Sequence, residues 1–562
     1  MFGNLRQSMS WLHTWFGLVL GYVLVVVFFF GSLSVFDREI DRWAIPQTRF
    51  APQPMPSFDA MLAPIFRQIT PEASELAAAR QRVGGPLPTA LPVKSWSAYT
   101  THRDPVLAMY AEFAITNNPN DPNDEVYGHV TIDPRNGRLL PDDQLKIGSE
   151  FFYPMHIGLN FTWKNLGYWI VGLAALAMLA ALVSGLIIHR RIFREFFTFR
   201  PHKQIQRSTL DLHNLSGVVA LPFHFFFALT GLTIFAAMYF PVSETLLKPQ
   251  AEAAAIATAQ SKGMAFTPAG VSAPLASVDA MVLEAKRHWA ARGMPGEVGY
   301  LFINHVGDRN SSVSIYRAGS DRVSLVGQAI HFEGPTGRVL YEEPASTLVS
   351  GINDFLTGLH LQHFEHWLLR WFYVFGGLSG CVCIVTGFLF FVEKRKRQHA
   401  KAGRLGARWV DAMAVATVTG PLLAVLCMLV ANRLLPPALP DRGGWEKAVF
   451  WAVWLLAFVH AAWRSAPVKL GGLSPAWREQ CQGIALMACA AVLLNAITTG
   501  DHIGATLARG YWPVAALDLS LLVVAALAAI AASKLSRRRR VAGAASATSG
   551  RPDVDGREAA SA

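Results

Sequence analysis

The sequence predicts a mainly α-helical, polytopic membrane protein, with a four-helix core built from two similar halves and four additional helices after it. Three observations support this fold class. Hydrophobic residues make up 52% of the 562 residues, and the mean hydropathy of +0.29 is high for a soluble protein. Several apolar segments are long enough to span a bilayer. Similar segments also recur about 200 residues apart.

Eight segments are predicted to cross the membrane. The first, 11–36, carries no charge and has no small-residue cleavage site after it, so we expect a retained helix rather than a signal peptide. The other seven are 167–188, 215–240, 368–392, 412–434, 447–463, 480–498 and 512–532.

Basic residues predict the orientation of these spans. They gather in "HRRIFREFFTFRPHKQIQR" (189–207), "EKRKRQHAKAGR" (393–404) and "RRRR" (537–540). Because Lys and Arg flanking a span stay on the cytoplasmic side, we expect both termini in the cytoplasm and two large loops outside. The net charge of +11 then reflects topology and contact with anionic membrane lipids, and it does not indicate nucleic acid binding.

The predicted domains follow from these boundaries. Each half is a helix, an α+β module outside the membrane and a second helix, and the alternating stretches "VLAMYAEF" and "SSVSIYR" are typical of module strands. The order is span 1–36, module 37–165, span 166–189, basic loop 190–210, span 211–240, module 241–358, span 359–393, basic loop 394–411, four spans within 412–533, and a disordered tail 534–562.

Histidines occupy matching positions in the two halves. His13 in "LHTWFGLV" corresponds to His213 in "LHNLSGVV", and His156 precedes the second span as His360 precedes the fourth. If an axis along the membrane normal relates the halves, each pair faces across it. Two neutral imidazoles facing each other in apolar surroundings are the ligands of a low-spin b-type haem. The alternative is that each histidine only anchors a helix end.

Glycines and two further histidines extend this hypothesis. Gly17 and Gly217 follow their histidines by four residues, so each lies on the same helix face, where a missing side chain leaves room for a porphyrin edge. A small-residue helix contact would explain them as well. His224 lies three turns beyond His213 on about the same face, and His189 ends the second span. The five cysteines form no CxxCH motif, so any haem is held without thioether links.

Four stretches resemble the PepSY-associated transmembrane helix family: "SMSWLHTWFGLVLG", "SGLIIHRRIFREFFTFRP", "QRSTLDLHNLSGVVALPFHFFFALTGL" and "GLHLQHFEHWLLRWFYVFGGLSG". The resemblance does not cover the last four spans. It implies a bacterial inner-membrane protein with periplasmic PepSY modules, and some members are di-haem reductases of ferric siderophores. The family's histidines match His13, His156, His189, His213, His224 and His360. Four of these six would be axial ligands of two b-type haems.

We therefore expect an oxidoreductase that transfers electrons across the membrane. An inner and an outer haem would pass electrons to a ferric siderophore or other ferric chelate in the periplasm, and reduction would release Fe(II). The sequence has no GxGxxG motif, so the donor is expected to be a separate cytoplasmic protein or a membrane quinol. The alternative function is a membrane-anchored interaction or regulatory protein without redox activity.

Overall fold

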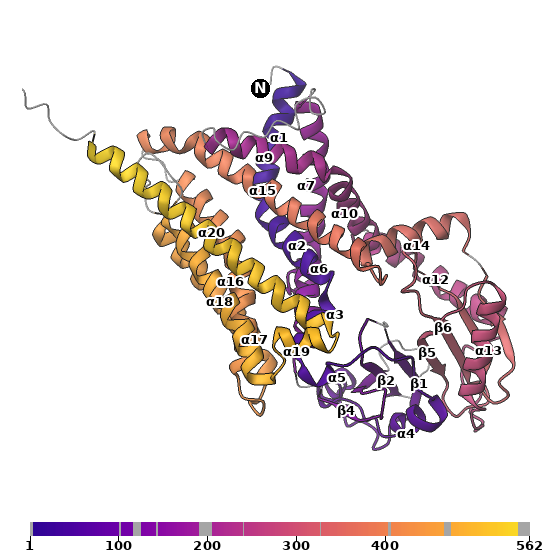
Figure 1. Ribbon diagram of the computed structural model, residues 1–562. Coiled ribbons are helices and arrows are strands. Elements are labelled where there is room, and N and C mark those ends of the chain that lie inside the picture. Colours follow the sequence, from indigo (N-terminus) through magenta and orange to yellow (C-terminus); the bar gives the residue numbers. More distant parts are fainter. Residues whose placement is uncertain are drawn as a thin grey trace, which may run out of the picture.

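The computed structural model describes residues 4–100, 103–115, 125–141, 144–189, 205–239, 241–325, 327–344, 346–402, 406–465 and 474–548. Long helices form a bundle, and eight strands form one sheet domain beside one end of it (Figure 1). The N-terminus lies at the far end of the bundle from this domain. The described part of the chain is therefore mainly helical, as the sequence predicts.

Five helical segments are long and apolar enough to cross a membrane, and two bent helix pairs raise the number to seven if each pair is one span. The five are Trp163–Ile188, Trp367–Arg395, Gly406–Leu434, Pro475–Thr499 and Trp512–Arg537. This confirms a multi-pass membrane protein. The remaining expected span, 447–463, falls in α17 (Arg442–Arg464), which is not among the seven, so its crossing stays a prediction.

The first and third expected spans are each broken into two helices, which corrects the continuous helices that we predicted. α1 (Leu5–Val19) meets α2 (Gly21–Ser34) at 60°, and α9 (Ile205–Val219) meets α10 (Leu221–Ile234) at 64°. In the second pair, Pro222 stands in the first turn of α10. Its missing N–H and fixed φ favour starting a new helix there. The breaks, at Leu20 and Ala220, lie about two helical turns beyond His13 and His213.

The eight strands form one antiparallel sheet in the order β4-β3-β2-β1-β5-β6-β7-β8. The first module supplies β1 (Val93–Tyr99), β2 (Leu107–Ala114), β3 (Glu125–Ile132) and β4 (Leu139–Leu140), and the second supplies β5 (Val298–Asn304), β6 (Ser312–Arg317), β7 (Ala329–Glu333) and β8 (Val339–Glu342). β1 pairs with β5, with Ser97 opposite Phe302. Each module thus covers an exposed edge of the other.

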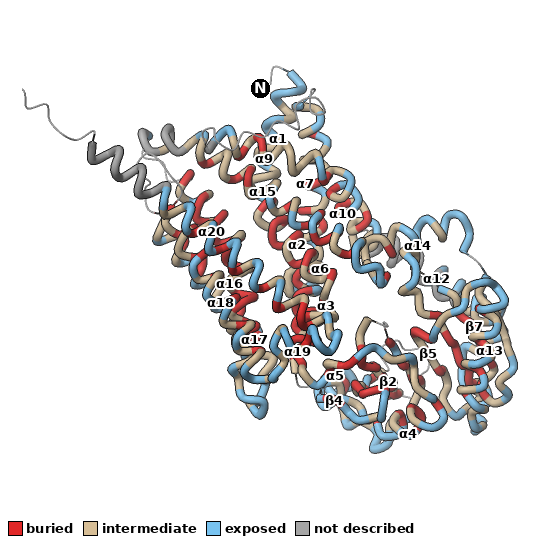
Figure 2. The backbone as a smooth tube through the Cα atoms, in the orientation of Figure 1, coloured by how far each residue is buried: buried red, intermediate tan, exposed pale blue. Residues whose placement is uncertain are grey.

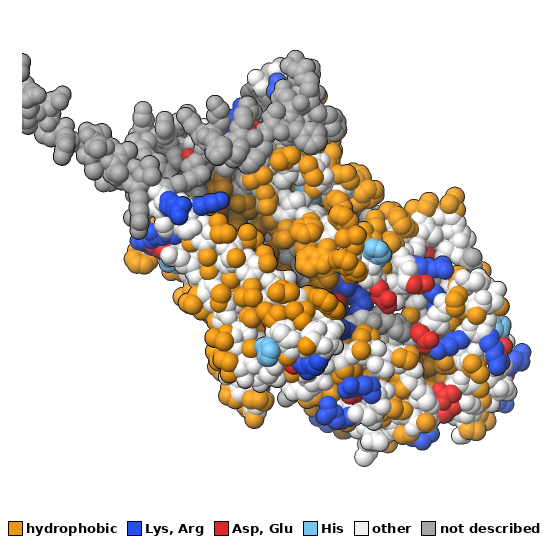
Figure 3. Space-filling model, in the orientation of Figure 1, with side chains coloured by type: hydrophobic (Ala, Val, Ile, Leu, Met, Phe, Trp, Pro, Cys, Tyr) orange, Lys and Arg blue, Asp and Glu red, His pale blue; other side chains and the backbone are white. Residues whose placement is uncertain are grey.

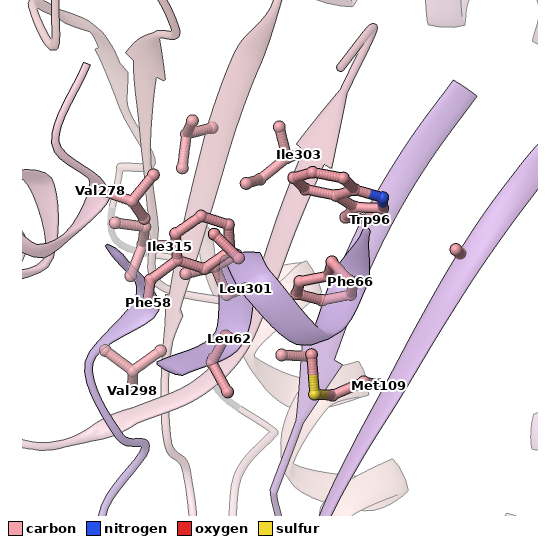
Figure 4. Packing of buried hydrophobic residues seen from close by; sticks show 14 of the residues in the cluster. Phe58, Leu62, Phe66, Trp96, Met109, Val278, Val298, Leu301, Ile303 and Ile315 are labelled. Carbon is pink, nitrogen blue, oxygen red and sulfur yellow. The ribbon is translucent and has the colours of Figure 1, made fainter. Parts of the chain in front are cut away.

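Helices cover one face of this sheet and share a single core with it (Figure 4). They are η2 (Phe58–Leu62), α4 (Ala63–Phe66), α5 (Ala73–Val83) and α13 (Val278–Ala291). Ser57 and Asp59 at the start of η2 exchange hydrogen bonds with Ser277 and Asp279 at the start of α13: Ser57 donates to Asp279 at 2.5 Å, and Ser277 donates to Asp59 at 2.6 Å. The two modules therefore act as one domain.

Helices of 3 to 21 residues connect the sheet domain to the bundle. They are α3 (Asp37–Ala44), η1 (Pro46–Thr48), η3 (Ile147–Phe152), α6 (Tyr153–Gly158), η4 (Trp163–Asn165), α11 (Ala236–Tyr239), α12 (Pro241–Ser261) and α14 (Leu348–Leu361), and the spans α7 (Leu166–Ile188) and α15 (Trp367–Lys401) follow α6 and α14. α1 packs on α7, α9 packs on α15, and α2 packs on both α7 and α15.

The C-terminal helices form a second group beside the helices of the two halves (Figure 2). They are α16 (Gly406–Leu434), α17, α18 (Pro475–Thr499), α19 (Ile503–Ala508) and α20 (Trp512–Thr548). Their apolar core also takes in Phe30 of α2 and Phe151 and Phe152 of η3. α20 continues to Thr548, so the tail expected to be disordered from residue 534 is helical up to that point. Most of the basic loop 190–210 lies outside the described residues.

Candidate functional site

The structure brings four of the six predicted histidines together in two pairs. The inner pair, His13 on α1 and His213 on α9, has ring centroids 6.0 Å apart. The outer pair, His156 on α6 and His360 on α14, lies at the end of the bundle next to the sheet domain, with centroids 6.1 Å apart. These are the same pairs that the sequence suggests, and their role as ligands stays a prediction.

The inner histidines are held through Nδ1 by the neighbouring span. His13 Nδ1 donates to the carbonyl oxygen of Ala181 on α7 at 3.0 Å, and His213 Nδ1 donates to that of Cys383 on α15 at 2.7 Å. Since a carbonyl oxygen can only accept, Nδ1 carries the proton in both rings. The lone pair of each neutral imidazole is therefore on Nε2.

The outer histidines are fixed in the same tautomer. His156 Nδ1 donates to the carbonyl oxygen of Val27 on α2 at 2.9 Å. His360 Nδ1 lies 2.7 Å from Thr230 Oγ1 on α10, and this hydroxyl gives its own proton to the carbonyl oxygen of Phe226. Thr230 must therefore accept from His360. A second group that binds the far ring nitrogen of a ligating histidine sets its orientation and tautomer.

A glycine stands behind each of the four rings. A Cβ added to Gly31 or Gly231 would lie 2.8 or 3.3 Å from Cε1 of His156 or His360, and a Cβ added to Gly185 or Gly387 would lie 3.5 Å from Cε1 of His13 or His213. The glycines that we predicted for this purpose behave differently: Gly17 has no atom within 4 Å of an added Cβ, and Gly217 faces Cys383. The similar stretches "SGLIIH" (184–189) and "TGFLFF" (386–391) align Gly185 with Gly387, and this similarity is the sequence signal that could have found the inner two.

The two remaining predicted histidines belong to neither pair. His224 on α10 is fully buried, and its Nε2 lies 3.2 Å from Ser379 Oγ, which donates to the carbonyl oxygen of Gly376. His224 therefore donates from Nε2, which is the opposite tautomer. His189 is exposed at the end of α7, next to residues that the structure does not describe.

A cavity of about 630 Å³ opens between the outer pair and the sheet domain. Its apolar side is formed by the spans, through residues such as Leu24, Phe28 and Phe227, with His156 and His360 among them. Its polar side is formed by the open face of the sheet and the connecting segments: Arg38, Tyr99, Arg103, Tyr300, Tyr316, Arg317, Arg322 and His363. The volume lies within the range of sites for small molecules and cofactors.

The polar side of the cavity is basic. Four arginines line it and Asp37 is its one carboxylate among the described residues. Arg103 lies 2.9 Å from Asp37. Charged side chains gather at this junction between the apolar surface of the bundle and the sheet domain (Figure 3). Arg38 also contacts Asp104, and Arg317 and Arg322 contact Asp321, so part of the positive charge is neutralised within the protein. The remaining excess of positive charge on this wall favours anionic ligands.

An ion pair between Glu39 and Arg370 joins α3 to α15 at the end of the bundle next to the sheet domain. The Arg370 guanidinium at the start of α15 binds both carboxylate oxygens of Glu39 on α3, at 2.9 and 2.8 Å, and also the carbonyl oxygen of Val35. Burial opposes ionisation of Glu39, but Arg370 outweighs it and holds the pKa of this carboxyl below its usual value. α3 is thereby anchored beside the outer histidine pair.

The donor set of each pair fits a haem iron. Two imidazoles on opposite sides of one metal ion have centroids roughly 6 Å apart, because metal–nitrogen bonds are about 2.0–2.1 Å long. Two imidazoles leave most coordination positions of iron open, and a porphyrin supplies four nitrogens. Among the described residues, no group of three or more His, Cys, Asp or Glu side chains is placed to hold a metal ion by itself. For the outer pair, the adjoining cavity and its arginines also suit a macrocycle with anionic propionates.

Comparisons with known proteins agree with the fold. The sequence model of the family described as PepSY-associated TM region matches residues 10–394, which is more than half of the chain. An uncharacterized protein of Pseudomonas aeruginosa is 26% identical over 378 residues, covering 64% of this chain and 88% of that protein. The family match ends at residue 394, before the C-terminal helices α16 to α20 begin.

Proposed function

The chain belongs to the PepSY-associated transmembrane family, and on this premise we propose that it is a haem b-containing electron-transfer protein of the bacterial inner membrane. In this proposal both termini are cytoplasmic and the sheet domain is periplasmic. The inner pair holds one haem and the outer pair another. Electrons from a cytoplasmic protein or a membrane quinol reach a ferric siderophore or related chelate, and iron leaves as Fe(II).

The observation that supports this proposal most strongly is the common tautomer of the four paired histidines. All four Nδ1 atoms donate to groups on a neighbouring helix. Each ring therefore presents the lone pair of Nε2, and the two rings of each pair have centroids 6.0 and 6.1 Å apart. A helix-end anchor needs only one polar contact per histidine and gives no reason for the histidines of the two halves to lie in pairs. Haem bound between such rings would supply a one-electron redox couple.

The residues around the outer pair have separate roles in this proposal. The spans exclude water from the inner side of the cavity, which favours neutral imidazole and raises the strength of electrostatic interactions there. Arg38, Arg103 and Arg322 face the cavity from the polar side. They would bind haem propionates or the oxygen donors of an anionic chelate. The tyrosines Tyr99, Tyr300 and Tyr316 give the same wall aromatic surface.

The first test is the reduced-minus-oxidised visible spectrum of the purified protein, with pyridine haemochrome quantification of haem per chain. We expect a b-type spectrum and about two haems per chain. His13→Ala and His360→Ala should each remove one haem and keep the other. His129→Ala on β3 is the matched control and should retain both, because His129 lies in the sheet domain and pairs with Glu72.

A second test addresses reduction of iron. Protein reduced under anaerobic conditions is mixed with a ferric trihydroxamate, and Fe(II) is trapped with a coloured chelator. Oxidation of the haem spectrum together with Fe(II) release would support the proposal, and His360→Ala should abolish fast release. Folded protein that stays colourless despite an ample haem supply would refute it, and would leave the interaction or regulatory function as the better explanation.

A further inference from the structure

Helix α14, which carries His360 near its end, has an uncovered apolar stripe. Leu348, Val349, Ile352 and Phe355 are 82%, 78%, 53% and 47% exposed. Their spacing places them on one side of the helix. A contiguous apolar surface of this kind indicates contact with another apolar phase or partner.

The opposite side of α14 is fixed to the rest of the protein. Leu325 N donates to the carbonyl oxygen of Asp354, and Ser346 donates to the Asp354 carboxylate, both at 3.0 Å. Gly358 lies so close to the loop before residue 326 that an added Cβ would be 1.9 Å from the carbonyl oxygen of Val323. α14 therefore cannot rotate to bury its stripe while these contacts last.

The matching positions in the first half are covered by protein. The alignment of His156 with His360 also aligns Leu145 with Val349 and Phe151 with Phe355. Leu145 and Phe151 are only 5% and 1% exposed. Phe151 packs against Phe450 of α17 with ring centroids 4.8 Å apart, and Gly443 at the start of α17 contacts Leu145. The C-terminal helices thus cover in one half what stays open in the other.

Lipid fits the open stripe better than water does. α15 begins six residues after α14 ends, and its first turns expose Trp367, Phe372 and Phe375, as expected of a span that faces lipid. The apolar surface of the bundle adjoins the α14 region (Figure 3), and Glu365 is the one exposed carboxylate in the segment between α14 and α15. Within α14 the only charged residue is Asp354, which contacts the loop segment described above.

We propose that α14 is an interfacial helix whose stripe lies in the leaflet next to the sheet domain, where lipid takes the place that α17 has in the other half. An amphipathic helix in this position buries its apolar face at the boundary of headgroups and acyl chains. It would fix the depth of the His360 segment relative to the bilayer. The proposal depends on exposure and packing alone, so it holds whether or not haem binds.

The test places a fluorophore on the stripe. Val349→Cys and Ile352→Cys are made in the full chain, labelled with bimane and reconstituted into nanodiscs of phosphatidylcholine and phosphatidylglycerol. Arg287→Cys on α13 is the matched control, because its side chain is exposed on the sheet domain. The unsubstituted chain measures labelling of the native cysteines. Fluorescence is then quenched with lipids that carry a nitroxide near the top of the acyl chain, and separately with iodide in the buffer.

We expect nitroxide lipid to reduce the fluorescence at 349 and 352 at least twofold and to leave 287 unchanged, with iodide giving the reverse order. Strong iodide quenching at 349 and 352 without lipid quenching would overturn the proposal in favour of a water-exposed face. Protection from both quenchers, with disulfide-linked dimers of Val349→Cys, would overturn it in favour of a second copy. Haem content is measured on the same samples, so failure of either proposal is distinguishable from failure of the other.

Discussion

Substituting Gly31 by alanine should displace one ring of the outer histidine pair. An added Cβ would lie 2.8 Å from both Cε1 and Nδ1 of His156, whereas ordinary contact begins at 3.4 Å. The ring must therefore move by about 0.6 Å, yet its Nδ1 is held at 2.9 Å by the carbonyl oxygen of Val27. Overpacking in a close-packed interior costs about 1–3 kcal/mol. The strained hydrogen bond adds about 0.5–1.5 kcal/mol.

Part of this cost is offset, because alanine favours a helix interior over glycine by about 1 kcal/mol. The net destabilisation of Gly31→Ala should then be about 0.5–3.5 kcal/mol, concentrated at the outer site. The assay combines the thermal midpoint in detergent with haem per chain and the reduced-minus-oxidised spectrum. We expect a lower midpoint and loss or alteration of the outer haem signal, with the inner signal intact.

The other three glycines provide a graded control series. An added Cβ at Gly185 or Gly387 stays at 3.5 Å from the histidine, so these variants should keep both haems and lose no stability. Gly231→Ala, at 3.3 Å, should fall between the extremes. The reasoning is refuted if Gly31→Ala keeps the wild-type spectrum and midpoint, or if the four variants cannot be ranked by these distances.

Three further predictions concern single contacts. Arg370→Ala should cost about 3–5 kcal/mol, seen as a lower thermal midpoint, because it removes both hydrogen bonds from Arg370 to the Glu39 carboxylate. Since the pKa of Glu39 is lowered on folding, the stability that this pair contributes is present above about pH 4.3 and is lost as pH falls further; a Glu39→Gln variant should lack that acid-dependent loss in a pH series of melts. Asp279→Ala removes one side of the exchange with Ser57 and should cost about 0.5–2 kcal/mol, which limited proteolysis of the sheet domain would detect. Thr230→Val leaves His360 Nδ1 without its acceptor and should shift the midpoint potential of the outer haem only, as redox titration would show.

The sequence predicts most of the membrane architecture because hydropathy and charge depend little on tertiary contacts. The pairing of His13 with His213 is also predictable, since it needs only the repeat and a symmetry axis. The breaks at Leu20 and Ala220 were not predicted. Pro222 is a local signal for the second break, but the first has no proline, and composition alone cannot distinguish a bent span from a straight one.

The joining of the two modules into one sheet was also not predicted. The alternation of apolar and polar residues identifies β1 and β5 as strands. It does not tell whether a strand lies in the middle or at the edge of a sheet, because both kinds alternate when only one face is buried. In the sequence, the only sign of the reciprocal contacts of Asp59 and Asp279 is that both residues stand in similar short stretches, "SFDAML" and "SVDAMV". Their exchange across the two modules requires that the chain bring segments about 220 residues apart into contact.

The anchoring of the paired histidines shows a general limit of sequence reasoning. Three of the four Nδ1 partners are backbone carbonyl oxygens, at Val27, Ala181 and Cys383, and any residue type could supply them. What those sites require is close approach of two helices, which the glycine behind each ring permits. Ser184 Oγ and Cys383 Sγ also lie 3.2 and 3.6 Å from Nδ1 of His13 and His213, but beside a carbonyl contact, whereas Nδ1 of His360 is bound by the Thr230 side chain alone. The His360 contact is therefore the one anchor that a point substitution can remove without moving a helix, and it is where the chain can tune one site independently of the other.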